Sequence, residues 1–171
     1  MADFGPSALG TKEHWDNTYE VELENFKSHE EEGEIWFGEK VQREVVQYFI
    51  NKIESKSVCI MDIGCGNGVL LRQLANKGGF SNLKGFDYSE NAIQLAKNIA
   101  KAGNELESKI DLFVGDFLDG SFAHRCGIAL DKGTYDAVSL TTLPDASKPL
   151  DFYRQQYKNS LTQCFMPKLQ F

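Results

Sequence analysis

The apolar residues in the first third of the chain recur at helical spacing. From Thr11, apolar side chains follow every three or four positions and predict a helix whose apolar face holds Trp15, Tyr19, Leu23 and Phe26. After an acidic turn, residues 35–53 repeat this spacing and predict a second helix, with Val41, Val45, Tyr48, Phe49 and Ile53 on its apolar face. Residues 1–10 are mostly small or polar and include glycine and proline, so we expect a flexible leader there.

From residue 55 the pattern changes to short apolar runs that alternate with helical stretches. The runs predict four buried strands, at residues 57–63, 82–87, 109–116 and 135–142. Helical stretches follow the first strand up to Lys77, the second at residues 89–103 and the fourth at residues 149–165, with Ser89 as the expected N-cap of the second. This order predicts an α/β fold, a doubly wound parallel sheet that is covered on both faces. In such sheets ligands bind beyond the carboxyl ends of the strands.

Composition and charge narrow the classes of function. The chain has 171 residues, of which 42% are hydrophobic and 25% charged, as expected for a single globular domain. Its 18 basic and 25 acidic residues give a net charge of -7, which argues against a nucleic-acid partner and favours a basic protein. No apolar run has membrane-spanning length and no secretory signal is recognisable, so we expect a cytoplasmic protein without a membrane partner.

The four cysteines are scattered along the chain. They are Cys59, Cys65, Cys126 and Cys164, and no histidine stands near them at metal-ligand spacing. We interpret them as reduced thiols and expect no metal site, with a disulfide or metal role as the less favoured interpretation.

A glycine loop follows the first predicted strand, in the segment MDIGCGNG at residues 61–68. Gly64, Gly66 and Gly68 allow the backbone to turn tightly and to approach a ligand closely. A dinucleotide site usually has G-x-G-x-x-G spacing, whereas this loop has G-x-G-x-G. Asp62 would also repel a pyrophosphate, by roughly 1–4 kcal/mol at near contact, and would attract an ammonium group. S-adenosyl-L-methionine carries such an ammonium group together with a carboxylate and a sulfonium, so the loop favours this cofactor.

Two further acids end the next two predicted strands. Asp87 follows Gly68 by 19 residues, where a carboxylate can accept both ribose hydroxyls. Asp116 ends the third strand, where we expect it to reach the adenine amino group, and the neighbouring Tyr88 and Phe117 are expected to flank the adenine ring. The alternative interpretation is that these acids only cap a helix or a turn.

Four segments resemble successive motifs of the class I, seven-strand S-adenosylmethionine-dependent methyltransferases: VCIMDIGCGNG, LKGFDYSENAIQLA, IDLFVGDF and YDAVSL. Three others resemble, more narrowly, the eukaryotic methyltransferase-like proteins that methylate a lysine of translation elongation factor 1-alpha: SALGTKEHWDNTYEVELENF, GEIWFGE and DKGTYDAVSL. The likeness runs from about Ser7 to about Leu161. It implies a Rossmann-like fold and a protein-lysine N-methyltransferase whose protein partner is elongation factor 1-alpha.

The resemblance also implies roles for individual residues. Cofactor contacts carry over to Asp62, Gly64, Gly66, Asp87, Tyr88 and Asp116. Residues 11–54 are expected to cover the cofactor site, with Trp15 and Trp36 bordering the cofactor and the substrate entrance, although both tryptophans could instead be packed in the core. The methyltransferase domain itself is expected to occupy residues 55–171.

No side chain is expected to act as a dedicated catalytic base. A lysine substrate has a pKa near 10.4 and must lose a proton, and desolvation in an aromatic channel beside the sulfonium favours that loss. Thr141 and Thr142, at the end of the fourth predicted strand, are candidate substrate contacts. An Asn-Pro-Pro-Tyr motif is absent, which argues against adenine or glutamine as the methyl acceptor. Asp131 and Lys132 precede that strand and are interpreted as a solvated pair in a loop.

The family fold has seven strands, whereas this sequence predicts four. We therefore expect an incomplete domain that stops after the fourth strand and its following helix. Two alternative functions remain open. One is a catalytically incompetent isoform or fragment that retains at most cofactor or partner binding, and the other is a small-molecule methyltransferase.

Overall fold

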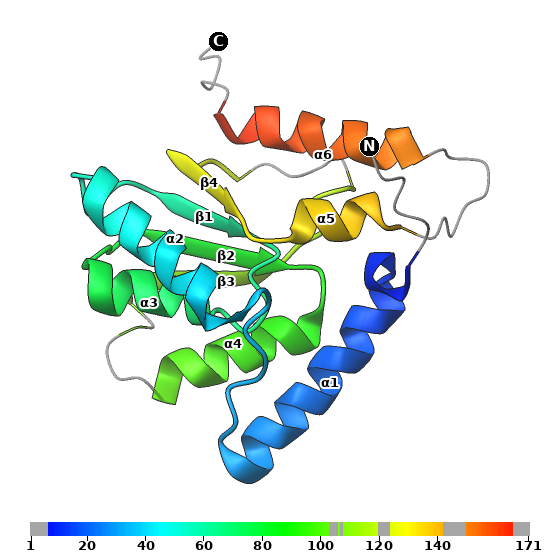
Figure 1. The fold of residues 1–171 in the computed structure, drawn as a ribbon, viewed down its shortest axis with the longest axis horizontal. Helices are drawn as coiled ribbons and strands as arrows, with labels where there is room; N and C mark the ends of the chain where they lie inside the picture. The colour runs from blue at the N-terminus through cyan, green and yellow to red at the C-terminus, as the bar shows by residue number, and fades with distance from the viewer. Residues whose placement is uncertain (1–6, 103–105, 107, 120–123, 142–149, 166–171) are drawn as a thin grey trace.

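A parallel sheet lies at the centre of the chain in the computed structural model, which describes residues 7–102, 106, 108–119, 124–141 and 150–165 (Figure 1). Within these residues the sheet has four strands in the order β3-β2-β1-β4. The strands are β1 Ile60–Ile63, β2 Leu83–Asp87, β3 Ile110–Val114 and β4 Ile128–Asp131. Ile60 pairs with Leu83 on one side and with Ile128 on the other, so the carboxyl ends of the strands meet at one edge.

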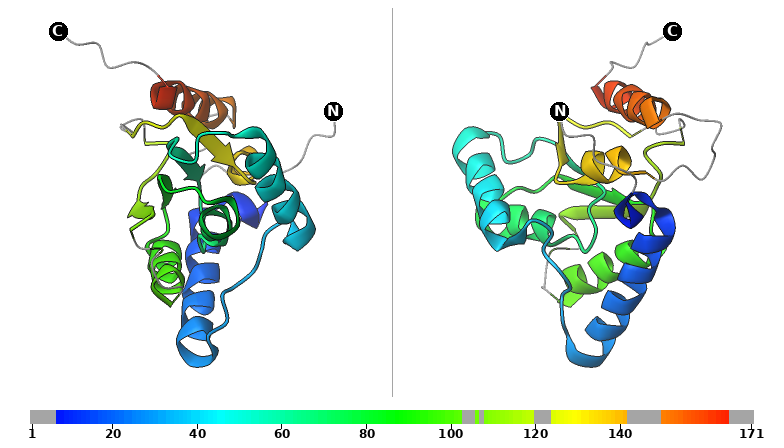
Figure 2. Two further views of the ribbon diagram at one scale, coloured as in Figure 1. Left: turned by 90° about the vertical axis from the view of Figure 1, so that its left-hand side faces the viewer. Right: turned by 45° about the vertical axis from the view of Figure 1, so that its right-hand side comes forward.

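Helices cover both faces of the sheet (Figures 1 and 2). They are η1 Ala8–Gly10, α1 Lys12–His29, α2 Gly38–Lys52, α3 Val69–Gly78, α4 Glu90–Ala102, α5 Thr134–Ser139 and α6 Leu150–Phe165. Apolar residues of α2, α3 and α4 pack on one face, and those of α5 and α6 pack on the other. Helix α1 packs against α4 and lies near the carboxyl ends of the strands. The predicted doubly wound α/β fold is therefore confirmed.

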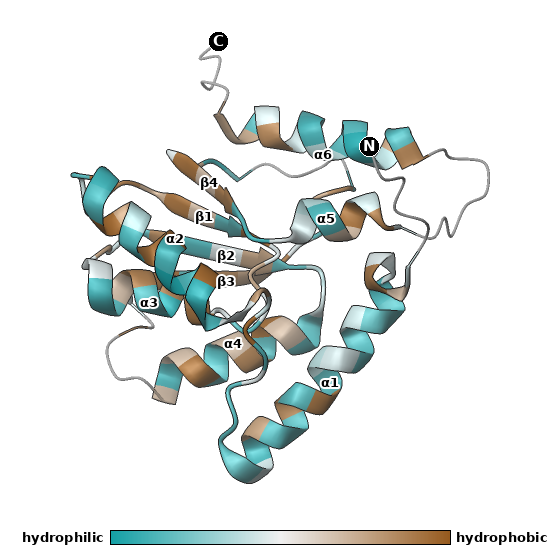
Figure 3. Cartoon of the chain, viewed as in Figure 1, coloured by the Kyte–Doolittle hydropathy of each residue, from teal (hydrophilic) through white to brown (hydrophobic). Residues whose placement is uncertain are grey.

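Alternation along the strands explains the two cores. In β1, Ile60 faces the core beneath α3 while Met61 and Ile63 face the core beneath α6, because successive side chains of a strand point to opposite faces. Figure 3 shows apolar residues along all four strands and mixed colours on the helices, as expected for helices with one face on a core. None of the described helices combines the length and the apolar character that crossing a membrane would require.

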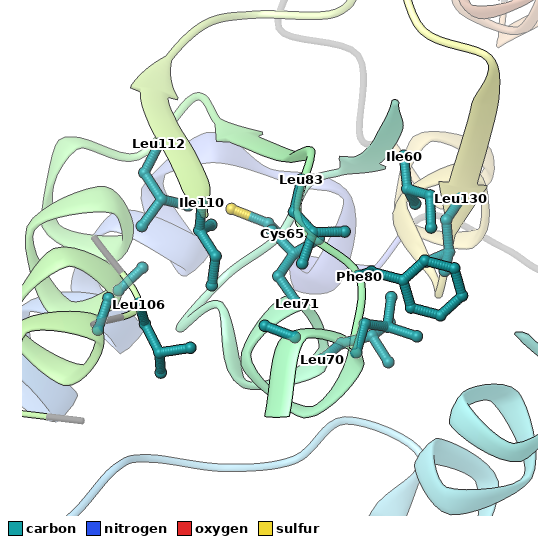
Figure 4. Packing of buried hydrophobic residues seen from close by; sticks show 14 of the residues in the cluster. Ile60, Cys65, Leu70, Leu71, Phe80, Leu83, Leu106, Ile110, Leu112 and Leu130 are labelled. Carbon is teal, nitrogen blue, oxygen red and sulfur yellow. The ribbon is translucent and has the colours of Figure 1, made fainter. Parts of the chain in front are cut away.

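Leu71 of α3 lies at the centre of the first core and is fully buried (Figure 4). We expect Leu71→Ala to lower the free energy of unfolding by about 3 kcal/mol, because a cavity replaces well-packed apolar contacts. Urea unfolding followed by far-ultraviolet circular dichroism measures this change. Val21→Ala is the matched control, since Val21 is 60% exposed, and its free energy of unfolding should change by less than about 0.5 kcal/mol.

The prediction of a fourth strand at residues 135–142 was wrong. Residues 134–139 form helix α5, and the fourth strand is the short run Ile128–Asp131. Gly133 has a φ of +112°, which turns the chain after the strand, and the Asp131 carboxylate accepts the backbone N–H groups of residues 133–135. These bonds satisfy donors that a helix start leaves free, so they stabilise a helix where alternating apolar residues favoured a strand.

The flexible leader predicted for residues 1–10 was wrong in its last four residues, while residues 1–6 lie outside the described part. Ser7 donates its backbone N–H to the carbonyl oxygen of Leu140 at 3.1 Å, and η1 follows it directly. A Cβ atom on Gly10 would lie 2.2 Å from the Leu140 backbone, so only glycine allows this close approach. The beginning of the described chain is thus fixed against the end of α5.

Candidate active site

The glycine loop connects β1 to α3 and is shaped by backbone conformations that favour glycine. Gly64, Gly66 and Gly68 have φ angles of +66°, +53° and +69°. A Cβ on Gly66 would lie 2.3 Å from the Tyr19 hydroxyl oxygen, and one on Gly64 would lie 2.1 Å from Oγ1 of Thr134. Helices α1 and α5 therefore approach the loop closely, and a larger residue at either position would push them away.

Asp62 is a buried carboxylate at the carboxyl end of β1, with 3% of its surface exposed. Burial raises its pKa to about 8; the Lys132 ammonium group counteracts this rise, and the carboxylates of Asp131 and Asp87 add to it. Within the described residues no hydrogen bond to the Asp62 carboxylate contributes to this balance. A buried acid without a hydrogen-bonding partner is costly, and a cationic ligand would relieve that cost.

Asp87 holds the glycine loop against the start of α4. One of its oxygens accepts the backbone N–H of Gly66 at 3.1 Å and the other accepts that of Ser89 at 3.0 Å. Burial raises the pKa of Asp87 to about 6, although these two bonds oppose the rise. Each oxygen keeps a lone pair for a further donor, so Asp87 can act as a cap and still accept hydroxyl groups from a ligand.

Ser89 directly precedes α4, as predicted for its N-cap. Its hydroxyl oxygen is buried and has no hydrogen-bond partner among the described residues. The side chain of Asp87, rather than that of Ser89, therefore stabilises the start of this helix.

The third predicted acid and its neighbours lie in different environments. Asp116 is exposed after β3, and its carboxylate accepts the backbone N–H of Leu118 at 2.8 Å, as a turn cap does. The ring of Phe117 is 4% exposed and packs against Phe86 and Tyr157, so it lies in the second core rather than on an open surface. Tyr88 is half-buried, and the Lys12 ammonium lies 5.2 Å from its ring centre.

Residues 30–37 run past the glycine loop and are attached to it. Asn67 donates from Nδ2 to the carbonyl oxygens of Glu32 at 2.9 Å and Glu34 at 3.2 Å, and Arg72 of α3 pairs with the Glu32 carboxylate. The sequence predicted only an acidic turn here, and the attachment of these residues to the glycine loop was not predicted. Residues 11–54 were expected to cover the site as a whole. Helix α1 and residues 30–37 do approach the glycine loop, whereas α2 packs on the sheet.

Trp36 belongs to this attached segment and meets Trp15 of α1. Their ring centres lie 4.7 Å apart in an edge-to-face arrangement, and Trp15 donates its indole N–H to the carbonyl oxygen of Leu9 at 2.7 Å. The Trp36 Nε1 atom is buried and has no hydrogen-bond partner among the described residues. Trp36 therefore offers a free donor, whereas the donor of Trp15 is used within the protein.

The turn at residues 131–134 joins several parts of the site. Asp131 and Lys132 were interpreted as a solvated pair in a loop; Asp131 is exposed, but both side chains bind other segments. Asp131 accepts the three N–H groups at the start of α5 and the hydroxyl of Tyr157 from α6. Lys132 donates to the Trp36 carbonyl oxygen at 2.9 Å, and Thr134 donates to the Ile63 carbonyl oxygen at 2.6 Å. An aspartate two to three residues before a helical stretch is a typical capping signal, which would have identified the role of Asp131.

Comparisons with known proteins agree with this geometry. The sequence pattern of the family described as "Methyltransferase domain" matches residues 54–148. The chain belongs to this methyltransferase family. It is 44% identical over 165 residues to EEF1A lysine methyltransferase 2 of Mus musculus, covering 94% of this chain and 63% of that protein. It is 37% identical over 150 residues to protein-lysine N-methyltransferase EFM4 of Saccharomyces cerevisiae, covering 82% and 64% respectively. The chain thus spans less than two thirds of the length of both proteins.

Solved structures show the same fold. The methyltransferase domain of bacterial CtHen1 superposes with a TM-score of 0.55 at 20% identity, covering 75% of this chain and 62% of that one. Magnesium protoporphyrin IX methyltransferase of Synechocystis PCC 6803 with bound SAM superposes with a TM-score of 0.50 at 16% identity, covering 72% and 68%.

Thr141 and Thr142 were predicted to contact the substrate because they were expected to end the fourth strand. Because residues 134–139 of the methyltransferase domain are helical, Thr141 follows a helix, and its hydroxyl donates to the Val138 carbonyl oxygen at 2.9 Å. Thr142 lies outside the described residues. Thr141 does not lie at the end of a strand.

The folded chain therefore brings together only part of the predicted site. Asp62, Gly64, Gly66 and Asp87 meet at the carboxyl edge of β1 and β2, joined by the unpredicted Tyr19, Lys132 and Thr134. The roles of these residues in binding stay predictions. Among the described residues no group of three metal-ligating side chains is close enough to hold an ion.

Proposed function

We propose that this methyltransferase domain transfers a methyl group from S-adenosyl-L-methionine to a lysine side chain of translation elongation factor 1-alpha. The observation that carries the proposal is the buried Asp62 carboxylate, which has no hydrogen-bond donor among the described residues and lies beside the glycine loop. The names of the relatives, which are 37–44% identical, support a protein lysine as acceptor and EEF1A as the protein that carries it.

The residues of the site fit the chemical groups of this cofactor. Asp62 would hold the ammonium group, and the glycine loop would let the cofactor lie close to the backbone. Asp87 keeps free lone pairs for both ribose hydroxyls, and the exposed Asp116 would accept a bond from the adenine amino group. When bound, the cofactor supplies a methyl group on a sulfonium, which is already a good leaving group.

The protein's main task is then to orient a neutral amine and to exclude water. Holding the amine in line with the methyl group can contribute on the order of 7 kcal/mol to the reaction. Trp15 of α1 and Trp36, whose carbonyl oxygen binds Lys132, lie edge to face, and their aromatic surface would desolvate a lysine side chain and favour its neutral form.

The charge of the chain supports a basic protein as the partner. With a net charge of -7, the surface attracts a cationic protein and steers its approach. The proposal includes a cytoplasmic location, because the substrate is a translation factor.

A methyl-transfer assay tests the proposal. We expect the 171-residue chain, given S-adenosylmethionine with a labelled methyl group and purified elongation factor 1-alpha, to label a lysine of the factor. The same reaction with Asp62→Asn should give less than about one tenth of the label, because the ammonium group loses its counter-charge. The labelled lysine is located by mass spectrometry.

Three other results would contradict the proposal. If S-adenosylhomocysteine binds but no label reaches the factor, the chain is a cofactor-binding protein without transferase activity. If neither binding nor labelling occurs, the site assignment itself fails. If label appears only in small molecules of a protein-free extract, the acceptor is not a protein lysine.

A further inference from the structure

Two cysteines meet where the end of α6 lies beside the segment that leads into β4. Cys164 is in the last turn of α6 and is 1% exposed. The backbone N–H of Cys126 donates to the Cys164 carbonyl oxygen at 3.3 Å. The last carbonyls of a helix have no partner within the helix, so this bond fixes Cys126 against the helix end.

The two thiols also interact directly. A hydrogen bond between the side chains lowers the pKa of Cys164 and raises that of Cys126. Cys126 is only half-buried, so a small oxidant can reach the pair from solvent. The backbone bond and the thiol contact together keep the two sulfur atoms near each other in the folded protein.

A third cysteine lies next to this pair but has a different partner. The Cys59 thiol contacts the Arg125 carbonyl oxygen at 3.7 Å, and the Cys59 carbonyl oxygen accepts the backbone N–H of Gly127. No set of three metal ligands forms among the described residues, so this neighbourhood does not favour a metal site. The geometry favours chemistry between two sulfur atoms.

We propose that Cys126 and Cys164 form a reversible disulfide when the protein meets a two-electron oxidant such as hydrogen peroxide. One sulfur, as the thiolate, attacks the O–O bond of the peroxide and becomes a sulfenic acid as hydroxide leaves. The second sulfur displaces hydroxide from the sulfenic sulfur and forms the S–S bond. The two thiol protons convert both hydroxides to water, so the two thiols are oxidised to a disulfide and one peroxide is reduced to two waters.

The disulfide would connect the end of α6 to the segment that precedes β4, at the amino ends of the strands and away from the site. Tyr157 of α6 donates to Asp131, and Ser160 donates to the Phe117 carbonyl oxygen at 2.6 Å. A covalent bond one turn further along would therefore restrain the helix that supports the 131–134 turn. By closing residues 126–164 into a loop, it should raise the melting temperature by roughly 5–10 °C.

Peptide mapping of the full chain tests the proposal. We expect that hydrogen peroxide, followed by alkylation of free thiols and tryptic digestion, links the peptide of residues 126–132 to that of residues 159–168. Dithiothreitol should separate the two peptides and reverse the rise in melting temperature. Cys126→Ser is expected to abolish both the linked peptide and the rise, whereas Cys59→Ser should leave both unchanged.

Other products would overturn the inference. A link from the peptide of residues 126–132 to that of residues 57–72 would show that Cys59 or Cys65 is the partner. Sulfinic acid on Cys126 with Cys164 still alkylated would show that the two sulfur atoms do not react with each other. Because Cys126 is half-buried, its serine variant should fold, and a normal circular dichroism spectrum confirms this.

Discussion

Asp62→Asn is expected to weaken the binding of S-adenosylhomocysteine by about 100-fold while making the unliganded protein more stable. The loss of affinity follows from removing the negative partner of a buried ammonium group, which costs roughly 2–5 kcal/mol. The gain in stability follows because burial raises the pKa of Asp62 to about 8, so its ionisation opposes folding. Isothermal titration and urea unfolding measure the two effects on the same samples.

The gain in stability should depend on pH in a definite direction. Asp62 binds its proton more tightly in the folded than in the unfolded protein. The stabilising contribution of this proton to the free energy of unfolding is therefore fully present below pH 4 and is lost as the pH rises toward 8. Asparagine does not titrate. We therefore expect the stability advantage of the variant to grow by at least about 1 kcal/mol between pH 5 and pH 8.

The affinity of the wild type should depend on pH as well. Below pH 8 the ammonium group must displace a proton from Asp62, so affinity should rise about tenfold between pH 6.5 and pH 8. The asparagine variant should lack this rise. Wild-type affinity in the variant, or the same pH dependence in both proteins, would show that Asp62 does not hold the ammonium group.

Asp87→Ala is expected to lower the affinity for S-adenosylhomocysteine by about 100-fold and to destabilise the unliganded protein by about 1–2 kcal/mol. The variant loses the acceptor for the ribose hydroxyls and leaves the N–H groups of Gly66 and Ser89 without their bond. The same calorimetric and unfolding experiments measure both changes.

Ser89→Ala is the matched control for Asp87→Ala. The Ser89 hydroxyl is buried and unpaired among the described residues, so its removal should change the affinity by less than about twofold and should not destabilise the protein. If Asp87→Ala and Ser89→Ala lower the affinity equally, the effect comes from disturbing the start of α4, and Asp87 has no direct role in binding.

The sequence predicted those parts of the fold and the site that depend on local patterns. Glycines at alternating positions and acids at the ends of apolar runs are visible in single segments, and Asp62 and Asp87 do meet beside the glycine loop. The fourth strand was misplaced because Ile128–Asp131 is short, while the apolar alternation of residues 135–142 resembles a strand. Only the capping bonds of Asp131 show that the latter segment begins as a helix.

Contacts between distant segments could not be predicted from local patterns. Tyr19 reaches Gly66 because α1 packs along α4, and Lys132 reaches the Trp36 carbonyl oxygen across 96 positions of the chain. Phe117 shows the converse, because the sequence placed it next to an acid at a strand end, but its ring packs against Phe86 and Tyr157 in the second core. Such outcomes depend on how the helices are arranged around the sheet.

The segment over the glycine loop is attached largely through its main chain. Asn67 and Lys132 bind the carbonyl oxygens of Glu32, Glu34 and Trp36, and every amino acid carries such a carbonyl. Several side chains of this segment can therefore be exchanged while the anchoring bonds persist. The contacts that hold this segment over the glycine loop are thus separate from the side chains that it exposes, so evolution or an engineer can change what the segment recognises without disturbing those contacts.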